Sequence, residues 1–176
     1  MATVPQDKAA DFTASDLLAA DTWTGRAPRP ALGLDVACTK IAVDLQNIRR
    51  ENADECIRGS LELLREATAS DCAFALTFGA DSLKIADMQV ARAGFAPCRL
   101  EELLGESLDA YPWLKSRLEH LRLSELRDTG TPRREQQVEA RRFAELAIGS
   151  ALLVAFRIQG KPAGVIGLAQ SLPRGA

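Results

Sequence analysis

The stretch from Ser150 to Gln170 reads SALLVAFRIQGKPAGVIGLAQ, and it decides the fold. Residues 151–158 are rich in Leu, Val, Phe and Ile, and an apolar run resumes over residues 165–168. The intervening QGKP (residues 159–162) predicts a turn, because glycine accepts positive φ and proline fixes its own. Two such runs around a glycine-containing loop predict a β-hairpin. Both runs are almost continuously apolar, so both faces of the sheet are expected to be covered.

Two glycines interrupt the second run of this hairpin, at Gly164 and Gly167. A glycine on a strand lets another element approach closely or lets the strand bend. A second hairpin is predicted upstream. Residues 72–78 read CAFALTF, with alternate residues on alternate faces, and residues 83–90 return after the turn GADS. The chain therefore supplies two hairpins to an antiparallel sheet.

The longest helical pattern covers residues 35–70. It carries two apolar stripes at helical spacing, which are Ile41, Leu45 and Ile48, then Ile57, Leu61, Leu64 and Thr68. The polar residues 49–55 between them leave two alternatives. The helix breaks near Asn52 or Asp54, either of which can cap a new helix. Otherwise it runs through, and the first stripe is free to meet a partner chain.

Shorter helices are predicted between and after the first hairpin. Residues 99–108 form an amphipathic helix whose apolar side is Leu100, Leu103, Leu104 and Leu108. Pro112 suits the first turn of another helix, and residues 121–126 alternate like an edge strand. Residues 133–148 form a last helix, with Val138 among its candidate buried positions and Gly149 expected as a left-handed C-cap.

This order predicts an α+β fold. The expected architecture is an antiparallel sheet of about five to six strands, with a long helix on one face and short helices and loops forming a pocket on the other. Residues 1–34 are interpreted as a flexible leader, and residues 35–176 as the folded domain. The net charge of −2 argues against a nucleic-acid surface. No run of about 18 apolar residues exists, so no membrane span is expected and the cytoplasm is the expected location.

Three segments resemble parts of a GAF domain, the small-molecule sensor module of bacterial signalling proteins. ELLREATASDCAFALTF (62–78) is similar to the family's first helix and strand, and YPWLKSRLEHLRLSEL (111–126) to a Pro-Trp helix start with a short strand. FAELAIGSALLVAFRIQGKPAGVIGLAQ (143–170) resembles the closing helix and hairpin. The resemblance covers about residues 41–170 and implies a GAF/PAS-like fold.

The sequence departs from that family in three places. Val154-Ala155-Phe156 stands where the family often has Val-Pro-Leu, and the Asn-Lys-x-Asp-type signature of cyclic-nucleotide binders is missing. The resemblance therefore does not imply cyclic nucleotide binding. Third, family members typically end in a helix that leads to an output domain, whereas this sequence stops after SLPRGA (residues 171–176), so the chain is expected to be the sensor part of a longer protein.

No catalytic constellation is predicted. The GxSxG, HExxH and phosphate-loop motifs are missing, and the lone His120 lies at a polar helix end. The four cysteines, Cys38, Cys56, Cys72 and Cys98, lack the spacing of a metal site, so reduced thiols and no metal are expected. One GAF branch of similar length reduces free methionine sulfoxide with clustered cysteines, but its motifs do not align here.

The resemblance and the pattern together predict a ligand pocket and a dimer seam. The pocket candidates are Phe78, Met88, Tyr111, Trp113, Leu114, Leu118, Arg133, Val154 and Phe156. The dimer candidates are Ile41, Leu45 and Ile48. Arg133 or Arg134, near a helix N-terminus, either helps to hold an anionic ligand or belongs to a solvated helix face.

The predicted function is a non-catalytic sensory or regulatory domain without a cofactor. It binds a small molecule between the sheet and the short helices, forms a homodimer and acts on a downstream output domain. A ligand-free interaction module, its pocket filled by Trp113, Phe78 and Met88, is the alternative. A thiol-based methionine sulfoxide reductase is the third hypothesis.

Overall fold

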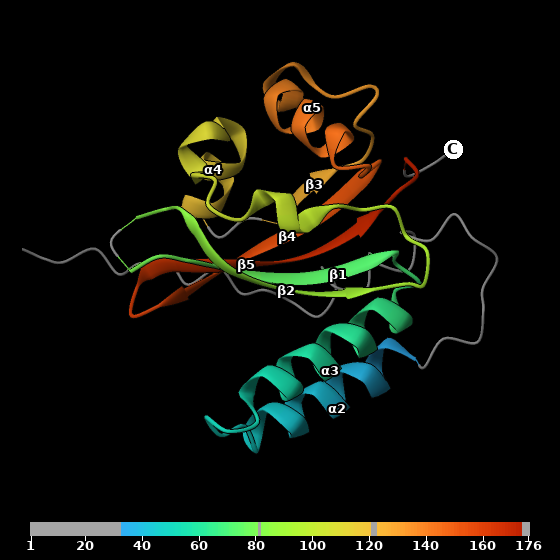
Figure 1. Ribbon diagram of the computed structural model, residues 1–176, viewed down its shortest axis with the longest axis vertical. Coiled ribbons are helices and arrows are strands. Elements are labelled where there is room, and N and C mark those ends of the chain that lie inside the picture. The colour runs from blue at the N-terminus through green and yellow to red at the C-terminus, as the bar shows by residue number, and fades with distance from the viewer. Residues whose placement is uncertain (1–32, 81, 121–122, 174–176) are drawn as a thin grey trace, which may run out of the picture.

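The chain folds around one antiparallel sheet. The computed structural model describes residues 33–80, 82–120 and 123–173. Five strands lie in the order β2-β1-β5-β4-β3, and helices cover both faces, with α2 and α3 on one side and α4 and α5 on the other (Figure 1). The strands are β1 (Cys72–Phe78), β2 (Ile85–Arg92), β3 (Ser124–Leu126), β4 (Ser150–Ile158) and β5 (Lys161–Gln170). The predicted α+β fold is confirmed.

The closing hairpin, β4 and β5, has a tighter turn than the sequence predicts. Only Gln159 and Gly160 connect the strands, with φ of 52° and 79°. Positive φ at both residues is the pattern of a type I′ turn, whose twist matches that of the flanking strands. Lys161 and Pro162 therefore already belong to β5.

The two glycines of β5 admit aromatic rings. A Cβ atom at Gly167 would lie 2.4 Å from Cζ of Phe74, and one at Gly164 would lie 2.5 Å from Cζ of Phe156. The same atom at Gly164 would lie 2.1 Å from the Leu76 carbonyl oxygen. Real Cβ atoms do not approach so closely, which confirms the predicted close approach at these positions.

The region predicted as one long helical pattern is a helical hairpin. Helix α2 spans Leu34–Gln46 and helix α3 spans Ala53–Ala67, so the chain breaks in the polar segment, as the first alternative has it. The second apolar stripe of the sequence packs on the sheet, where Leu61 meets Ala73, Ala91 and Leu168. Helix α3 lies on β1 and β2, and α2 lies outside it against α3 (Figure 1).

The described helices cover only part of the width of this face. Leu152 and Leu168 pack with α3, and alternation along the strands turns Val154 and Ile166 to the same face. Val154 and Ile166 are exposed. The prediction that both faces carry helices is confirmed, but α3 lies mainly on β1 and β2, so these two side chains stay exposed at the β4 end.

The other face carries short helices. They are η2 (Leu100–Leu103), η3 (Leu108–Ala110), α4 (Pro112–Glu119), η4 (Arg134–Gln136) and α5 (Gln137–Glu145). The prediction of one helix over residues 99–108 is wrong, because Gly105 adopts a φ of 83° and the chain turns there. Leu104 is consequently exposed. None of the described helices is long and apolar enough to cross a membrane.

The last helix also ends earlier than predicted. Ala147, with a φ of 59°, takes the left-handed position expected of Gly149. Gly149 is needed for space instead, because a Cβ there would lie 2.5 Å from the Leu172 carbonyl carbon. Val138, predicted to be buried, is exposed on α5.

Candidate ligand site

The apolar interior between the sheet and the short helices is almost full. Its unfilled volume is about 30 Å³, whereas ligand pockets usually hold ~300–1,000 Å³. The side chains around it come from β1, β2, β4, β5 and the short helices. They are Phe74, Leu76, Phe78, Ile85, Leu103, Leu108, Tyr111, Leu114, Phe143, Leu153 and Val165. As folded, this interior has room for no more than about one water molecule.

A larger cavity opens beside it, at the edge strand β3. Its volume is about 420 Å³, within the range of small-molecule sites. The walls come from α4, β3, the loop after β3, and η4. They are formed by Trp113, Arg117, Glu125, Arg127, Asp128, Thr131, Arg133, Glu135 and Gln136. We call this space the polar cavity.

The nine predicted pocket residues divide between these spaces. Phe78, Tyr111 and Leu114 line the apolar interior, whereas Trp113 and Arg133 line the polar cavity. The sequence places these residues in one pocket because it shows only that they flank the same face of the sheet.

The remaining four predicted pocket residues line neither space. Met88 and Leu118 belong to the core on the short-helix side. Val154 and Phe156 alternate with Leu153, which faces that core, so they lie on the opposite face of the sheet. The nine residues therefore do not form one site.

A buried glutamate, Glu139, positions the wall of the polar cavity. Pro112 begins α4, and the next two backbone N–H groups would lack partners inside the helix. Oε1 of Glu139, on α5, accepts both, at 2.9 Å from N of Trp113 and 3.2 Å from N of Leu114. Glu139 is 0% exposed, and its Oε2 has no partner among the described residues. This side chain thus joins α4 to α5 through the core.

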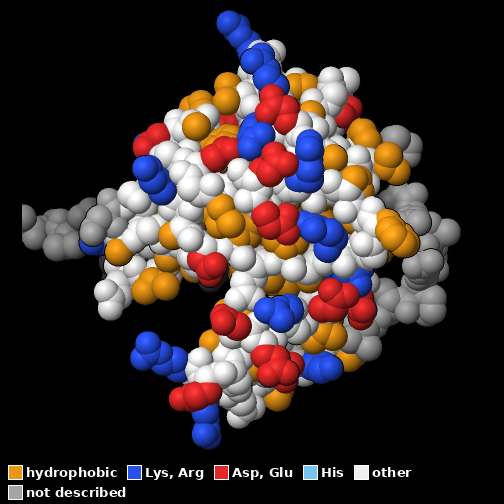
Figure 2. Space-filling model, viewed as in Figure 1, with side chains coloured by type: hydrophobic (Ala, Val, Ile, Leu, Met, Phe, Trp, Pro, Cys, Tyr) orange, Lys and Arg blue, Asp and Glu red, His pale blue; other side chains and the backbone are white. Residues whose placement is uncertain are grey.

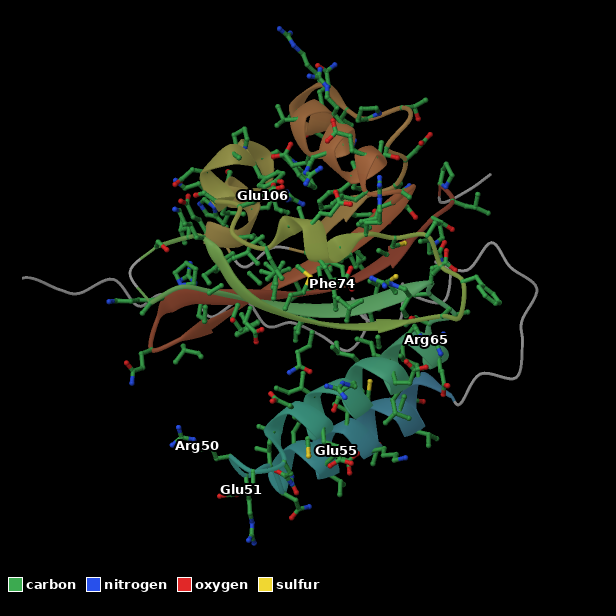
Figure 3. All side chains as sticks on the ribbon, in the orientation of Figure 1. Arg50, Glu51, Glu55, Arg65, Phe74 and Glu106 are labelled. Carbon is green, nitrogen blue, oxygen red and sulfur yellow. The ribbon has the colours of Figure 1, made fainter. Side chains whose placement is uncertain are left out.

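A second carboxyl group, that of Glu106, ties the same two helices to the loop before them. Oε1 of Glu106 accepts from Nη2 of Arg142 at 2.6 Å and from Nε at 3.1 Å. Oε2 accepts from the Tyr111 hydroxyl. Figure 3 labels Glu106 within this layer of short helices. Burial, together with Glu106, raises the pKa of Tyr111, so its hydroxyl remains a neutral donor.

The loop after β3 is fixed by its own polar contacts. Oδ1 of Asp128 accepts from N of Gly130 at 2.7 Å, and Oδ2 accepts from the Thr131 hydroxyl at 2.5 Å. The bonds from Thr131 and Gly130 lower the pKa of Asp128, so this carboxylate stays ionised at neutral pH. Oε2 of Glu125 pairs with Nε of Arg127 at 2.9 Å.

Two of the four cysteines lie beside each other in the core. Cys98 lowers the pKa of Cys72, and Arg92 also favours the Cys72 thiolate. Cys72 raises the pKa of Cys98, whose Sγ lies 3.8 Å from the Ala147 carbonyl oxygen. Cys72 and Cys98 are 0% and 2% exposed, so neither sulfur is open to a substrate. Among the described residues, Cys38 and Cys56 lie elsewhere, on α2 and α3.

Solved structures share this architecture. The phycocyanobilin-bound GAF domain from a cyanobacterial phytochrome is 15% identical with a TM-score of 0.63, covering 83% of this chain and 84% of that chain. A phycoerythrobilin-bound GAF domain from a cyanobacterial phytochrome is 14% identical with a TM-score of 0.59, covering 81% and 83%. The chain has the fold of a GAF domain. Sequence identities of 15% and 14% establish the GAF fold but not a particular ligand.

A third solved structure extends the comparison. The chromophore-binding domain of Stigmatella aurantiaca phytochrome P1 is 17% identical with a TM-score of 0.61, covering 87% of this chain and 56% of that longer chain. No family model matches the sequence, and no curated protein matches it. The resemblance found in the three sequence segments is therefore confirmed at the level of the GAF fold.

Proposed function

We propose that this chain is a non-catalytic sensory or regulatory domain of a bacterial signalling protein. The domain lies in the cytoplasm, binds a small molecule in the polar cavity and passes the signal to an output domain. The observation that carries the proposal is the difference in volume between the two spaces. The polar cavity of about 420 Å³ suits a metabolite, whereas the apolar interior of about 30 Å³ has no room for one.

The structurally similar GAF domains support a sensory role, because the two that are compared above are bilin-bound and come from phytochromes. This chain offers a bilin no preformed space in its interior. Acidic and basic side chains are interspersed over the face shown in Figure 2, which suits a soluble module without a nucleic-acid partner. A ligand shifts such a domain only by binding two of its conformations with different affinity. The Glu139 contact makes a joint movement of α4 and α5 the expected response.

A thermal-shift screen against metabolites and nucleotides tests ligand binding. At about 100 times the dissociation constant, a ligand adds about 2.7 kcal/mol to the free energy of unfolding, a rise of several degrees in Tm. Trp113→Leu should reduce the shift because Trp113 lines the cavity. Phe95→Leu is the matched control, because Phe95 is fully exposed elsewhere. A screen with no hit at saturating concentration would favour the ligand-free module.

We also propose that α2 forms a homodimer seam. Leu45 and Ile48 are 43% and 39% exposed at the free end of the α2–α3 hairpin, whereas Ile41 is partly buried. Figure 2 shows this end standing apart from the sheet, and Figure 3 places Arg50 and Glu51 at its tip. Ile48 lies just beyond the end of α2, whereas Leu45 is exposed on the helix itself, where an apolar side chain suits a second copy of that helix.

Leu45→Glu is expected to weaken such a dimer at least about tenfold, because it places a charge in an apolar seam. Gln46→Glu adds the same charge at the next, exposed position of α2 and serves as the control. Sedimentation equilibrium of both variants measures the dissociation constants. A dimer that is weakened equally by both changes, or by neither, places the seam elsewhere.

The ligand-free interaction module is the second candidate. Its support is the packed interior, in which Phe78 and Leu103 fill the space that a ligand would need. Trp113, which the sequence also assigns to that filling, lines the polar cavity instead. The burial of Cys72 and Cys98 argues against the thiol reductase.

A further inference from the structure

Three charged groups in the wall of the polar cavity form no ion pair with another described residue. Glu125 forms an ion pair with Arg127. The Asp128 carboxylate accepts hydrogen bonds from Gly130 and Thr131 of the same loop. The other charged lining residues are Arg117, Arg133 and Glu135. Two cations thus face one carboxylate.

Arg117 carries a buried donor without an acceptor. Its Nη2 donates to the Leu123 carbonyl oxygen at 3.1 Å. This bond holds the guanidinium, which extends from α4, against the segment just before β3. Its Nε is buried and has no partner in the part of the chain that the structure describes. Buried N–H groups in native proteins almost always have an acceptor. An acceptor supplied from the cavity would satisfy this group.

Arg133 is held in place by hydrogen bonds of its backbone. Its backbone N donates to Oε1 of Gln136 at 3.3 Å, and its carbonyl oxygen accepts from N of Gln136 at 2.9 Å. Nε2 of Gln136 in turn donates to the Glu125 carbonyl oxygen at 3.0 Å, joining η4 to β3. No described residue pairs with the Arg133 guanidinium. Arg134, the next residue, does not line the cavity.

We infer that the polar cavity takes a small organic anion whose carboxylate or phosphate group contacts Arg117 and Arg133. The planar guanidinium forks match both groups geometrically. The rest of the molecule lies against the Trp113 indole, which offers an apolar face in the same cavity. The three carboxylates of the wall disfavour a polyanion. This inference rests on the proposed function, whose ligand it assigns to a chemical class.

Binding of simple probes tests the class. The protein carries Trp23→Phe, so that Trp113 is the only tryptophan and its fluorescence reports on the cavity. Cyclohexanecarboxylate and cyclohexyl phosphate are titrated at constant ionic strength, with cyclohexylmethanol as the neutral analogue. Both probes have an apolar ring for Trp113, and the tighter one identifies the anionic group. We expect saturable quenching by at least one anion and none by the alcohol.

Three variants separate a specific contact from general electrostatics. Arg133→Gln should weaken anion binding about tenfold, the size expected for one charge-assisted contact. Arg133→Lys keeps the charge and should lose less. Arg134→Gln removes the same charge one residue away and should change the dissociation constant less than about twofold. Arg133 and Arg134 are both exposed, so the variants should fold.

Three results overturn the inference. The first is equal weakening of anion binding by Arg133→Gln and Arg134→Gln. The second is binding of the alcohol as tightly as the anions, and the third is no saturable binding of either anion. A neutral metabolite that stabilises the protein equally with and without Arg133→Gln would also refute the anion class, yet would leave the sensory function standing. A metabolite screen without hits, together with no anion binding, refutes both.

Discussion

Gly167→Ala is expected to lower the free energy of unfolding by about 3 kcal/mol, because it adds a methyl group to a filled core. The new Cβ would lie 2.4 Å from Cζ of Phe74 and 2.8 Å from Cδ2 of Leu153. Both neighbours are themselves buried, so neither ring nor methyl group can move aside without displacing others. Figure 3 labels Phe74 in the sheet, between the two helical layers. Urea denaturation followed by circular dichroism measures the change.

Gly59→Ala is the matched control for this substitution. Gly59 lies inside α3, and a Cβ there meets nothing within 4 Å. Alanine in a helix interior is favoured over glycine by about 1 kcal/mol, so this variant should be more stable than the parent protein. The double variant Gly167→Ala, Phe74→Leu should cost less than the sum of its single changes, because the smaller side chain vacates the contact. Additive losses would show that Phe74 does not occupy this space.

Local pattern is enough to predict the sheet. Residues 72–78 alternate between the two faces of the sheet, and the glycines of β5 leave space beside adjacent strands. The strand register decides which residues meet there, so these patterns indicate contacts between strands. The break between α2 and α3 follows from a polar segment that offers no apolar face. Each of these features depends on residues that are close in sequence or that pair between neighbouring strands of the sheet.

The candidate site is harder to predict because its contacts are distant in sequence. Glu139 serves N–H groups of α4 that lie 25 and 26 residues earlier, and Glu106 meets Arg142 across 36 residues. In the sequence, Glu139 belongs to a run of alternating charges that indicates a solvated helix face. Only the docking of α5 on α4 buries it. The division of the predicted pocket into two spaces likewise depends on side-chain volumes that periodicity does not encode.

Glu139→Ala should destabilise the domain by about 2–4 kcal/mol, because it leaves the backbone N–H groups of Trp113 and Leu114 buried without an acceptor. Glu139→Gln keeps one acceptor oxygen but places an amide N–H₂ where Oε2 has no partner, so about half that loss is expected. Glu145→Gln is the control on the same helix. It removes an exposed pair with Arg142 at 3.1 Å, which contributes at most about 0.5 kcal/mol.

Hydrogen exchange separates the positioning role of Glu139 from a general loss of stability. If its carboxyl group holds the start of α4, exchange at Trp113 and Leu114 should accelerate in Glu139→Ala beyond the change in global unfolding, while exchange in α3 follows the global value. Because α4 and η4 both wall the polar cavity, anion affinity should fall with the same variant and be partly retained in Glu139→Gln. Uniform acceleration across the sheet and helices would instead make Glu139 a core residue without influence on the cavity.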